Sequence, residues 1–178
     1  GKTIQTFSEV LQCPIEFNGA GGEWTLMDSL TTIEDVTLTY GTVRTNNNNM
    51  RCNSFYSTNN NARSLYLGTS TVWITDNSYG EWEVTASLII DADSSIIRLK
   101  DGGFFRAFSQ TYHIIQWDST FFVGGNELYG GGLTIDKIIS LNSHYSSELR
   151  LDNYWNTQVD SIFAWGKLRG MNMGLNNI

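Results

Sequence analysis

The 178-residue chain is poor in the residues that build metal and catalytic centres, with two histidines, two cysteines and one proline. A structural zinc site typically needs about four Cys or His ligands, and no CxxC spacing is present. A serine triad needs a nucleophile near a histidine base, and neither His113 nor His144 lies beside a GxSxG turn. The sequence therefore predicts no catalytic residues, no bound metal and no cofactor.

The two cysteines, Cys13 and Cys52, leave two interpretations open. In a secreted protein they would form one disulfide, and otherwise they would pack as two small apolar side chains. Their separation in the sequence does not show whether their Cα atoms approach each other, so both interpretations stand.

Basic residues are also scarce, because eleven Lys and Arg are scattered among 18 Asp and Glu and give a net charge of -7. Nucleic-acid binding depends on clustered Lys and Arg facing phosphates, so this class of function is excluded. No apolar stretch reaches about 18 residues, and no membrane span is predicted. Hydrophobic residues make up 40% and charged residues only 16%, which is the balance of a single folded domain with a packed interior.

Helix signals are nearly lacking as well. The longest candidate helix, Thr6 to Gln12, ends just before Pro14, which cannot continue it. Elsewhere, short apolar runs with period-two alternation lie between clusters of Gly, Asn, Ser and Asp, for example at 36–40, 71–74 and 148–151. This pattern is typical of β-strands bounded by turns, so the chain is predicted to be all-β.

Pairs of hydroxyl residues recur at spacings of 25, 25 and 27 residues, at 69–70, 94–95, 119–120 and 146–147. Apolar residues keep the same register after these pairs, namely Val72, Ile97, Phe122 and Leu149, and three more precede the first three pairs, namely Leu65, Ile90 and Ile115. One coil of a β-solenoid uses about 20 to 30 residues, and stacked coils lie about 4.8 Å apart. The spacing therefore predicts that the first four apolar residues form one inward ladder.

The prediction is a single right-handed parallel β-solenoid of about seven coils of roughly 25 residues. The alternative is a β-sandwich or jelly roll, which needs antiparallel hairpins and gives no reason for a 25-residue register. Residues 1–20 are expected to cap the first coil with the helix at 6–12, and residues 21–165 to form the solenoid. Residues 166–178 are expected to cap the last coil or to dock on another subunit, giving a homo-oligomer or filament through the solenoid ends.

Three stretches carry a resemblance to a known family: GEWTL at 22–26, LTYGTVRTN at 38–46 and NARSLYLGTSTVWIT at 61–75. They resemble the Gly/Thr/Asn-rich repetitive parallel β-helix modules of secreted bacterial surface proteins and phage tail fibres. The resemblance covers about residues 20 to 165. It implies a parallel β-helix that is secreted, at a cell surface or on a virion, and it transfers no catalytic residues.

An outward column is predicted from the positions between the inward ones, at Trp73, Arg98, Val123 and Arg150. Aromatic faces stack on sugar rings and guanidinium groups match carboxylates, so Trp73, Arg98 and Arg150 are the candidate glycan-binding residues. The other interpretation is that a neighbouring loop or molecule packs there.

The acidic residues Asp91, Asp93 and Asp118 allow a second kind of site, because a pair of carboxylates can cleave polysaccharides and Asp93 and Asp118 would stack one coil apart. The other interpretation is that they are turn residues that bond the local backbone, and this applies equally to a calcium site at Asp91, Asp93 and Asp101. The expected function is thus a non-enzymatic structural or adhesive module of an extracellular filament, cell-surface protein or virion fibre. The alternative is a carbohydrate-binding or polysaccharide-degrading β-helix protein.

Overall fold

The computed structural model describes residues 1–76, 80–100, 103–119, 126–142, 148–165 and 167–169. These residues form strands and turns and contain no helix. The strands are β1 (Lys2–Ile4), β2 (Val10–Leu11), β3 (Ile15–Leu26), β4 (Leu30–Thr32), β5 (Val36–Arg44), β6 (Met50–Cys52), β7 (Phe55–Ser57), β8 (Arg63–Tyr66), β9 (Thr71–Ile74), β10 (Glu81–Val84), β11 (Ile89–Asp91), β12 (Ile96–Lys100), β13 (Phe104–Phe108), β14 (Thr111–Ser119), β15 (Asn126–Gly131), β16 (Thr134–Asn142), β17 (Glu148–Trp155), β18 (Gln158–Trp165) and β19 (Lys167–Arg169).

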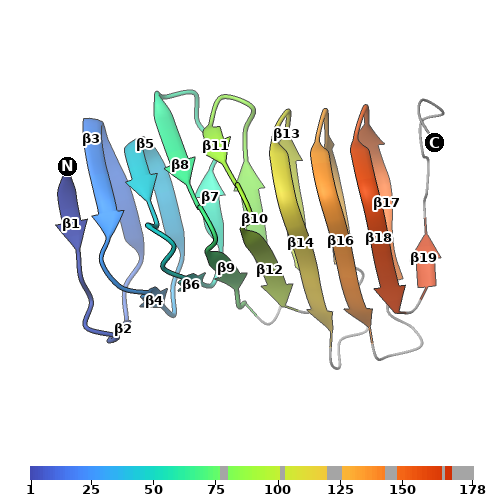
Figure 1. Ribbon diagram of the computed structural model, residues 1–178, viewed down its shortest axis with the longest axis horizontal. Coiled ribbons are helices and arrows are strands. Elements are labelled where there is room, and N and C mark those ends of the chain that lie inside the picture. Colours follow the sequence, from blue (N-terminus) through green and yellow to red (C-terminus); the bar gives the residue numbers. More distant parts are fainter. Residues whose placement is uncertain (77–79, 101–102, 120–125, 143–147, 166, 170–178) are drawn as a thin grey trace.

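Two stacks of parallel strands make up the molecule (Figure 1). The first sheet has the order β1-β3-β5-β7-β10-β13-β15-β17-β19, with β8 and β11 joined to it through β5. The second sheet has the order β18-β16-β14-β12-β9-β6-β4-β2. The chain thus alternates between the sheets and pairs each strand with its counterpart one coil away. This arrangement confirms the predicted parallel β-solenoid, and the sandwich alternative is not favoured because it would require antiparallel pairs.

The core consists of inward side chains stacked from coil to coil. In the second sheet, the Cα partners Met50, Val72, Ile97, Ile115 and Ile138 form one buried ladder. In the first sheet, the rings of Phe55 and Trp82 stack at 4.6 Å, and those of Trp82 and Phe105 at 6.4 Å. Burying such apolar surface is the main stabilising contribution to a fold whose strands are individually short.

The predicted register is correct for some coils and wrong for others. Val72 pairs with Ile97, and Leu65 pairs with Ile90, as predicted. Ile97 is followed by Ile115 and not by Phe122, which lies outside the described residues. Ile115 therefore belongs to the second sheet and is not above Ile90, and Leu149 lies in β17 of the first sheet.

The physical reason for these errors is that the coils differ in length. From β6 to β18, the partners in the inward ladder of the second sheet are 22, 25, 18, 23 and 24 residues apart. A constant period of 25 holds only between β9 and β12. Because a coil that loses residues shifts every later position, the repeat found around Val72 does not predict the partners beyond Ile97.

The shortest coil marks a change in the cross-section of the solenoid, which we call the step. Eleven residues, including β11, connect β10 to β12, whereas only Ser109 and Gln110 connect β13 to β14. The coils before the step have a third strand, β8 or β11, and the coil after it has none. The ladder of third strands therefore ends at β11 (Figure 1).

The predicted N-terminal helix at 6–12 is wrong. Lys2–Ile4 pairs with β3, Val10–Leu11 pairs with β4, and a turn with positive φ at Phe7 and Ser8 separates them. The Asp28 carboxylate of the next coil accepts the backbone N–H groups of Thr6 (2.9 Å) and Phe7 (2.7 Å). These bonds lower the pKa of Asp28 and satisfy donors that a helix would have left free, so pairing between coils prevails over the weak local signal.

Two other open points concern the cysteines and the C-terminal end. Cys13 is exposed, Cys52 is buried in the core, and both are free thiols, so the interpretation without a disulfide is the correct one. Of the segment 166–178, only β19 is described, and it pairs with β17. The expected capping or docking by the rest of that segment lies outside the described residues.

Candidate functional site: a groove at the step

Two adjoining hollows lie beside the ladder of third strands. The step hollow has a volume of about 300 Å³ and is lined by Ile90, Asp91, Ala92, Asp93, Thr111, Tyr112, His113 and Asp136. The turn hollow has a volume of about 260 Å³ and is lined by Thr25, Arg44, Asn46, Asn47, Tyr66, Gly68, Asp91 and Asp93. Because Asp91 and Asp93 line both, the two hollows form one groove, which we call the step groove.

The groove exists because two turns of different construction meet there. Asp93 has a φ of 38°, a conformation that Asp tolerates well, and it lets the chain turn sharply between β11 and β12, where Ser95 N–H bonds the Ala92 carbonyl at 2.7 Å. One coil later, the Gln110 side chain donates to the carbonyls of Thr85 (2.8 Å) and Leu88 (3.3 Å). A side chain thus holds this coil in place where a third strand would otherwise do so, and the space beside β11 stays open.

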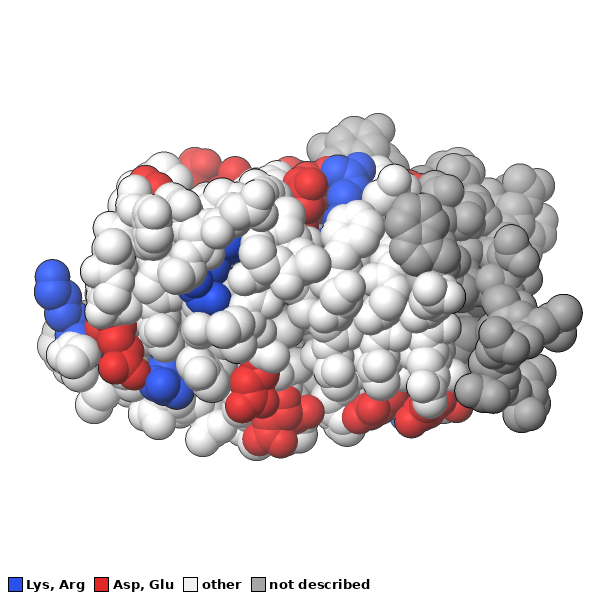
Figure 2. All heavy atoms as spheres, turned by 90° about the horizontal axis from the view of Figure 1, so that it is seen from above, with Lys and Arg blue, Asp and Glu red and all other residues white. Residues whose placement is uncertain are grey.

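The step hollow is acidic. His113 Nδ1 lies 2.8 Å from an Asp136 carboxylate oxygen, and both side chains are partly exposed. Asp91 and Asp93 form no ion pair among the described residues. Acidic side chains also gather in several small groups on the face shown in Figure 2, with few basic ones between them. The hollow therefore suits a cationic or hydrogen-bond-donating group better than an anionic one.

The turn hollow is built from paired groups. The Arg44 guanidinium lies 4.0 Å from the centre of the Tyr66 ring and 2.5 Å from a Glu23 carboxylate oxygen. The hydrogen bond from Arg44 holds the pKa of Glu23 below its usual value. Arg44, Tyr66 and Asp91 occupy equivalent positions on β5, β8 and β11, so cation, ring and carboxylate follow one another along the outside of the ladder.

Comparison of the chain with models of protein families, with curated proteins and with solved structures gave no match. The resemblance to β-helix modules of surface proteins and tail fibres is therefore a prediction from three stretches of sequence. No helix among the described residues is long and apolar enough to cross a membrane. No cluster of three or more His, Cys, Asp or Glu in the same part of the chain could hold a metal ion.

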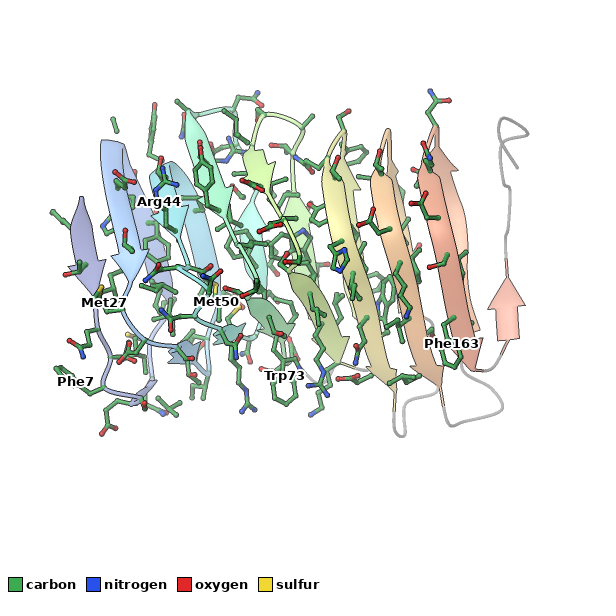
Figure 3. The ribbon with its side chains drawn as sticks, viewed as in Figure 1. Phe7, Met27, Arg44, Met50, Trp73 and Phe163 are labelled. Carbon is green, nitrogen blue, oxygen red and sulfur yellow. The ribbon has the colours of Figure 1, made fainter. Side chains whose placement is uncertain are left out.

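The predicted outward column is correct only in part. Trp73 and Arg98 are Cα partners on β9 and β12, as predicted, and Trp73 projects outward (Figure 3). Arg150 is wrong, because it lies on β17 of the first sheet, and Val123 lies outside the described residues. The next position in the column is Gln116.

Both faces of the Trp73 ring already carry a cation. The guanidinium groups of Arg51 on β6 and Arg98 on β12 each lie 4.6 Å from the ring centre, and β6 and β12 flank β9 on opposite sides. Arg98 also forms an ion pair with Asp118. A sugar ring can stack on Trp73 only if one arginine moves away, so this column is a weaker candidate for glycan binding than the step groove.

The carboxylates are also arranged differently from the prediction. Asp118 pairs with Lys100 in the second sheet and does not stack above Asp93, because the coil between them is short. Asp91 and Asp93 instead share a hollow with His113 and Asp136. The sequence analysis missed these two residues because they are 18 to 45 positions away and follow no common motif. A register that allowed for a short coil would have placed them next to Asp93.

Proposed function

We propose that this protein is a structural or adhesive module of an extracellular filament, a cell surface or a virion fibre, and that the step groove holds its binding partner. The observation that carries the proposal is the joining of the two hollows through Asp91 and Asp93. The groove sits on a solenoid in which ladders of hydrogen bonds and stacked core residues connect every coil to the next. Such a scaffold holds groove residues in a fixed arrangement, which favours recognition of a partner.

The ends of the solenoid support assembly into an oligomer or filament. At the N-terminal end, the edge strands β1 and β2 have only three and two residues, which limits pairing with another chain. At the other end, β18 has eight residues and pairs only with β16 among the described strands. A long edge offers many free backbone donors and acceptors, so we propose that copies associate through the β18 end.

A binding panel tests the adhesive function. Labelled full chain would be applied to immobilised glycans and to immobilised extracellular proteins and peptides. We expect retention on at least one surface, and at least a tenfold loss for the double variant Asp91→Asn/Asp93→Asn. The matched control is Asp160→Asn, which removes a carboxylate from an exposed position on β18. Equal retention of the wild type and the double variant would place the binding surface elsewhere, and no retention on any surface would contradict an adhesive role.

The second candidate function is binding or cleavage of a polysaccharide, and the composition of the groove is the observation that favours it. Tyr66, Asn46 and Asn47 offer an aromatic edge and amide groups, and carboxylates and an imidazole share the step hollow. These groups suit hydroxyl recognition, and a carboxylate pair could serve as acid and base. Release of reducing ends from acidic and neutral polysaccharides, with and without calcium, would establish this function. Retention without release would restrict the groove to binding.

A further inference from the structure

The free edge of β11 is directed into the step hollow. The Asp91 carbonyl accepts the Leu67 N–H at 2.9 Å, so the peptide groups of Asp91 face β8. Because these groups alternate in direction along a strand, the N–H and C=O of Ile90 face the opposite edge. Among the described residues, β8 is the only strand that pairs with β11. Ile90 therefore presents one donor and one acceptor to the hollow that it lines.

The opposite wall of the hollow comes from the following coil. β12 begins at Ile96, which pairs with Ile114, so Thr111–His113 extends past β12 towards the ladder of third strands. The space between Ile90 and Thr111–His113 has a volume of about 300 Å³, which is at the lower end of the range for ligand pockets. It lies where the next third strand would be if the ladder did not end at β11.

The side chains on the outer face of β11 define what could lie beside it. Ile89 is 63% exposed although it is large and apolar. Asp91, two residues later on the same face, continues the sequence of Arg44 and Tyr66 on the preceding strands. A strand added in parallel would place one residue beside Ile89 and another beside Asp91. An apolar residue would cover Ile89, and a basic residue would be attracted by Asp91 and Asp93.

We propose that the step groove binds an extended polypeptide segment, which adds a parallel strand to the free edge of β11. The segment has the pattern apolar, small or apolar, basic: the first residue covers Ile89, the second enters the hollow next to Ile90, and the Lys or Arg pairs with Asp91 and Asp93. This inference rests on the proposed adhesive function and names the partner of the same site. Backbone hydrogen bonds give such complexes their affinity, and the flanking side chains give them specificity.

The test uses the ¹⁵N-labelled full chain and the capped peptide Thr-Thr-Val-Val-Lys-Thr-Thr in an NMR titration. We expect saturable shifts of the amides of 89–93 and at least tenfold slower hydrogen exchange of the Ile90 N–H. Two control peptides have Glu in place of Lys, or the order Lys-Val-Val, and each should bind at least tenfold more weakly. The variant Asp91→Asn/Asp93→Asn should lose at least tenfold in affinity for the Lys peptide, and Asp160→Asn should lose none.

Each contrary result separates this inference from the function on which it rests. If the three peptides bind equally or not at all, while a glycan shifts the amides of Asp91 and Asp93, strand addition is wrong and the adhesive role of the groove stands. If the amides of 89–93 shift with protein concentration alone and light scattering shows dimers, the occupant is a second copy and the peptide proposal is wrong. If shifts occur only away from 89–93 and 111–113, both the inference and the groove proposal are wrong.

Discussion

The indole N–H of Trp82 donates a hydrogen bond to the phenol oxygen of Tyr112 at 3.2 Å in the interior of the solenoid. Both side chains are fully buried, and they come from opposite sheets one coil apart, since Trp82 lies on β10 and Tyr112 on β14. The Tyr112 hydroxyl in turn donates to the Gln110 side chain at 3.4 Å. Burial raises the pKa of Tyr112, so the phenol stays protonated and can act as both acceptor and donor. The bond therefore connects the two sheets at the step.

Tyr112→Phe should destabilise the protein by about 1 to 3 kcal/mol, because it leaves the Trp82 N–H and the Gln110 amide oxygen without this partner in the interior. Urea unfolding followed by tryptophan fluorescence measures the change. Tyr129→Phe is the control, because Tyr129 is 40% exposed, and it should change stability by less than about 0.5 kcal/mol. Equal effects of the two variants would show that the buried bond contributes nothing.

Ile97→Asp should destabilise the solenoid by several kcal/mol, on the order of 3 or more, because it places a carboxylate in the ladder between Val72 and Ile115. Arg98→Ala, one residue along, should cost much less, since that side chain faces outward and its ion pair is partly exposed. Circular-dichroism melts measure both. A larger loss for Arg98→Ala would indicate that the register of β12 is shifted by one residue.

Asp28 should make the N-terminal coil sensitive to acid. Its pKa is lowered mainly by the backbone hydrogen bond from Thr6 and also by that from Phe7, so it stabilises the folded state while it is ionised. This contribution is present above the unfolded pKa, which is about 3.9, and it is lost as the pH falls through the lower folded pKa. In an NMR titration, the Thr6 and Phe7 amides should shift with a midpoint below about 3.9. The same shifts in Asp28→Asn would rule out Asp28 as their cause.

The two thiols should react at very different rates with a disulfide reagent such as DTNB. Cys13 is exposed and should be modified at once, whereas Cys52 is buried and its pKa is raised by desolvation. We expect one equivalent of thiol to react in the native protein and two in 6 M guanidinium chloride. The control Cys13→Ser should show none in the native protein. Rapid modification of Cys52 would mean that the coil formed by β6 and β7 opens readily.

The sequence by itself determined the class of fold. Short alternating runs and a repeated register predict a parallel solenoid, because only stacked coils place residues 25 apart in contact. The pairs Leu65–Ile90 and Val72–Ile97 follow directly from that period, since both lie in coils of the length that the repeat describes. The pair Trp73 and Arg98 follows for the same reason, because the position between two inward residues must face outward.

The tertiary structure alone decided the site. Omitting the third strand after β11 shortens one coil to 18 residues, and no local pattern in Ser109 and Gln110 announces this. Because every later position shifts with it, Arg150 moves to the other sheet and Asp118 moves away from Asp93. The same change places His113 and Asp136 beside Asp93 and leaves the edge of β11 open. A groove at the end of a ladder depends on where coils differ, whereas a sequence repeat records only where they agree.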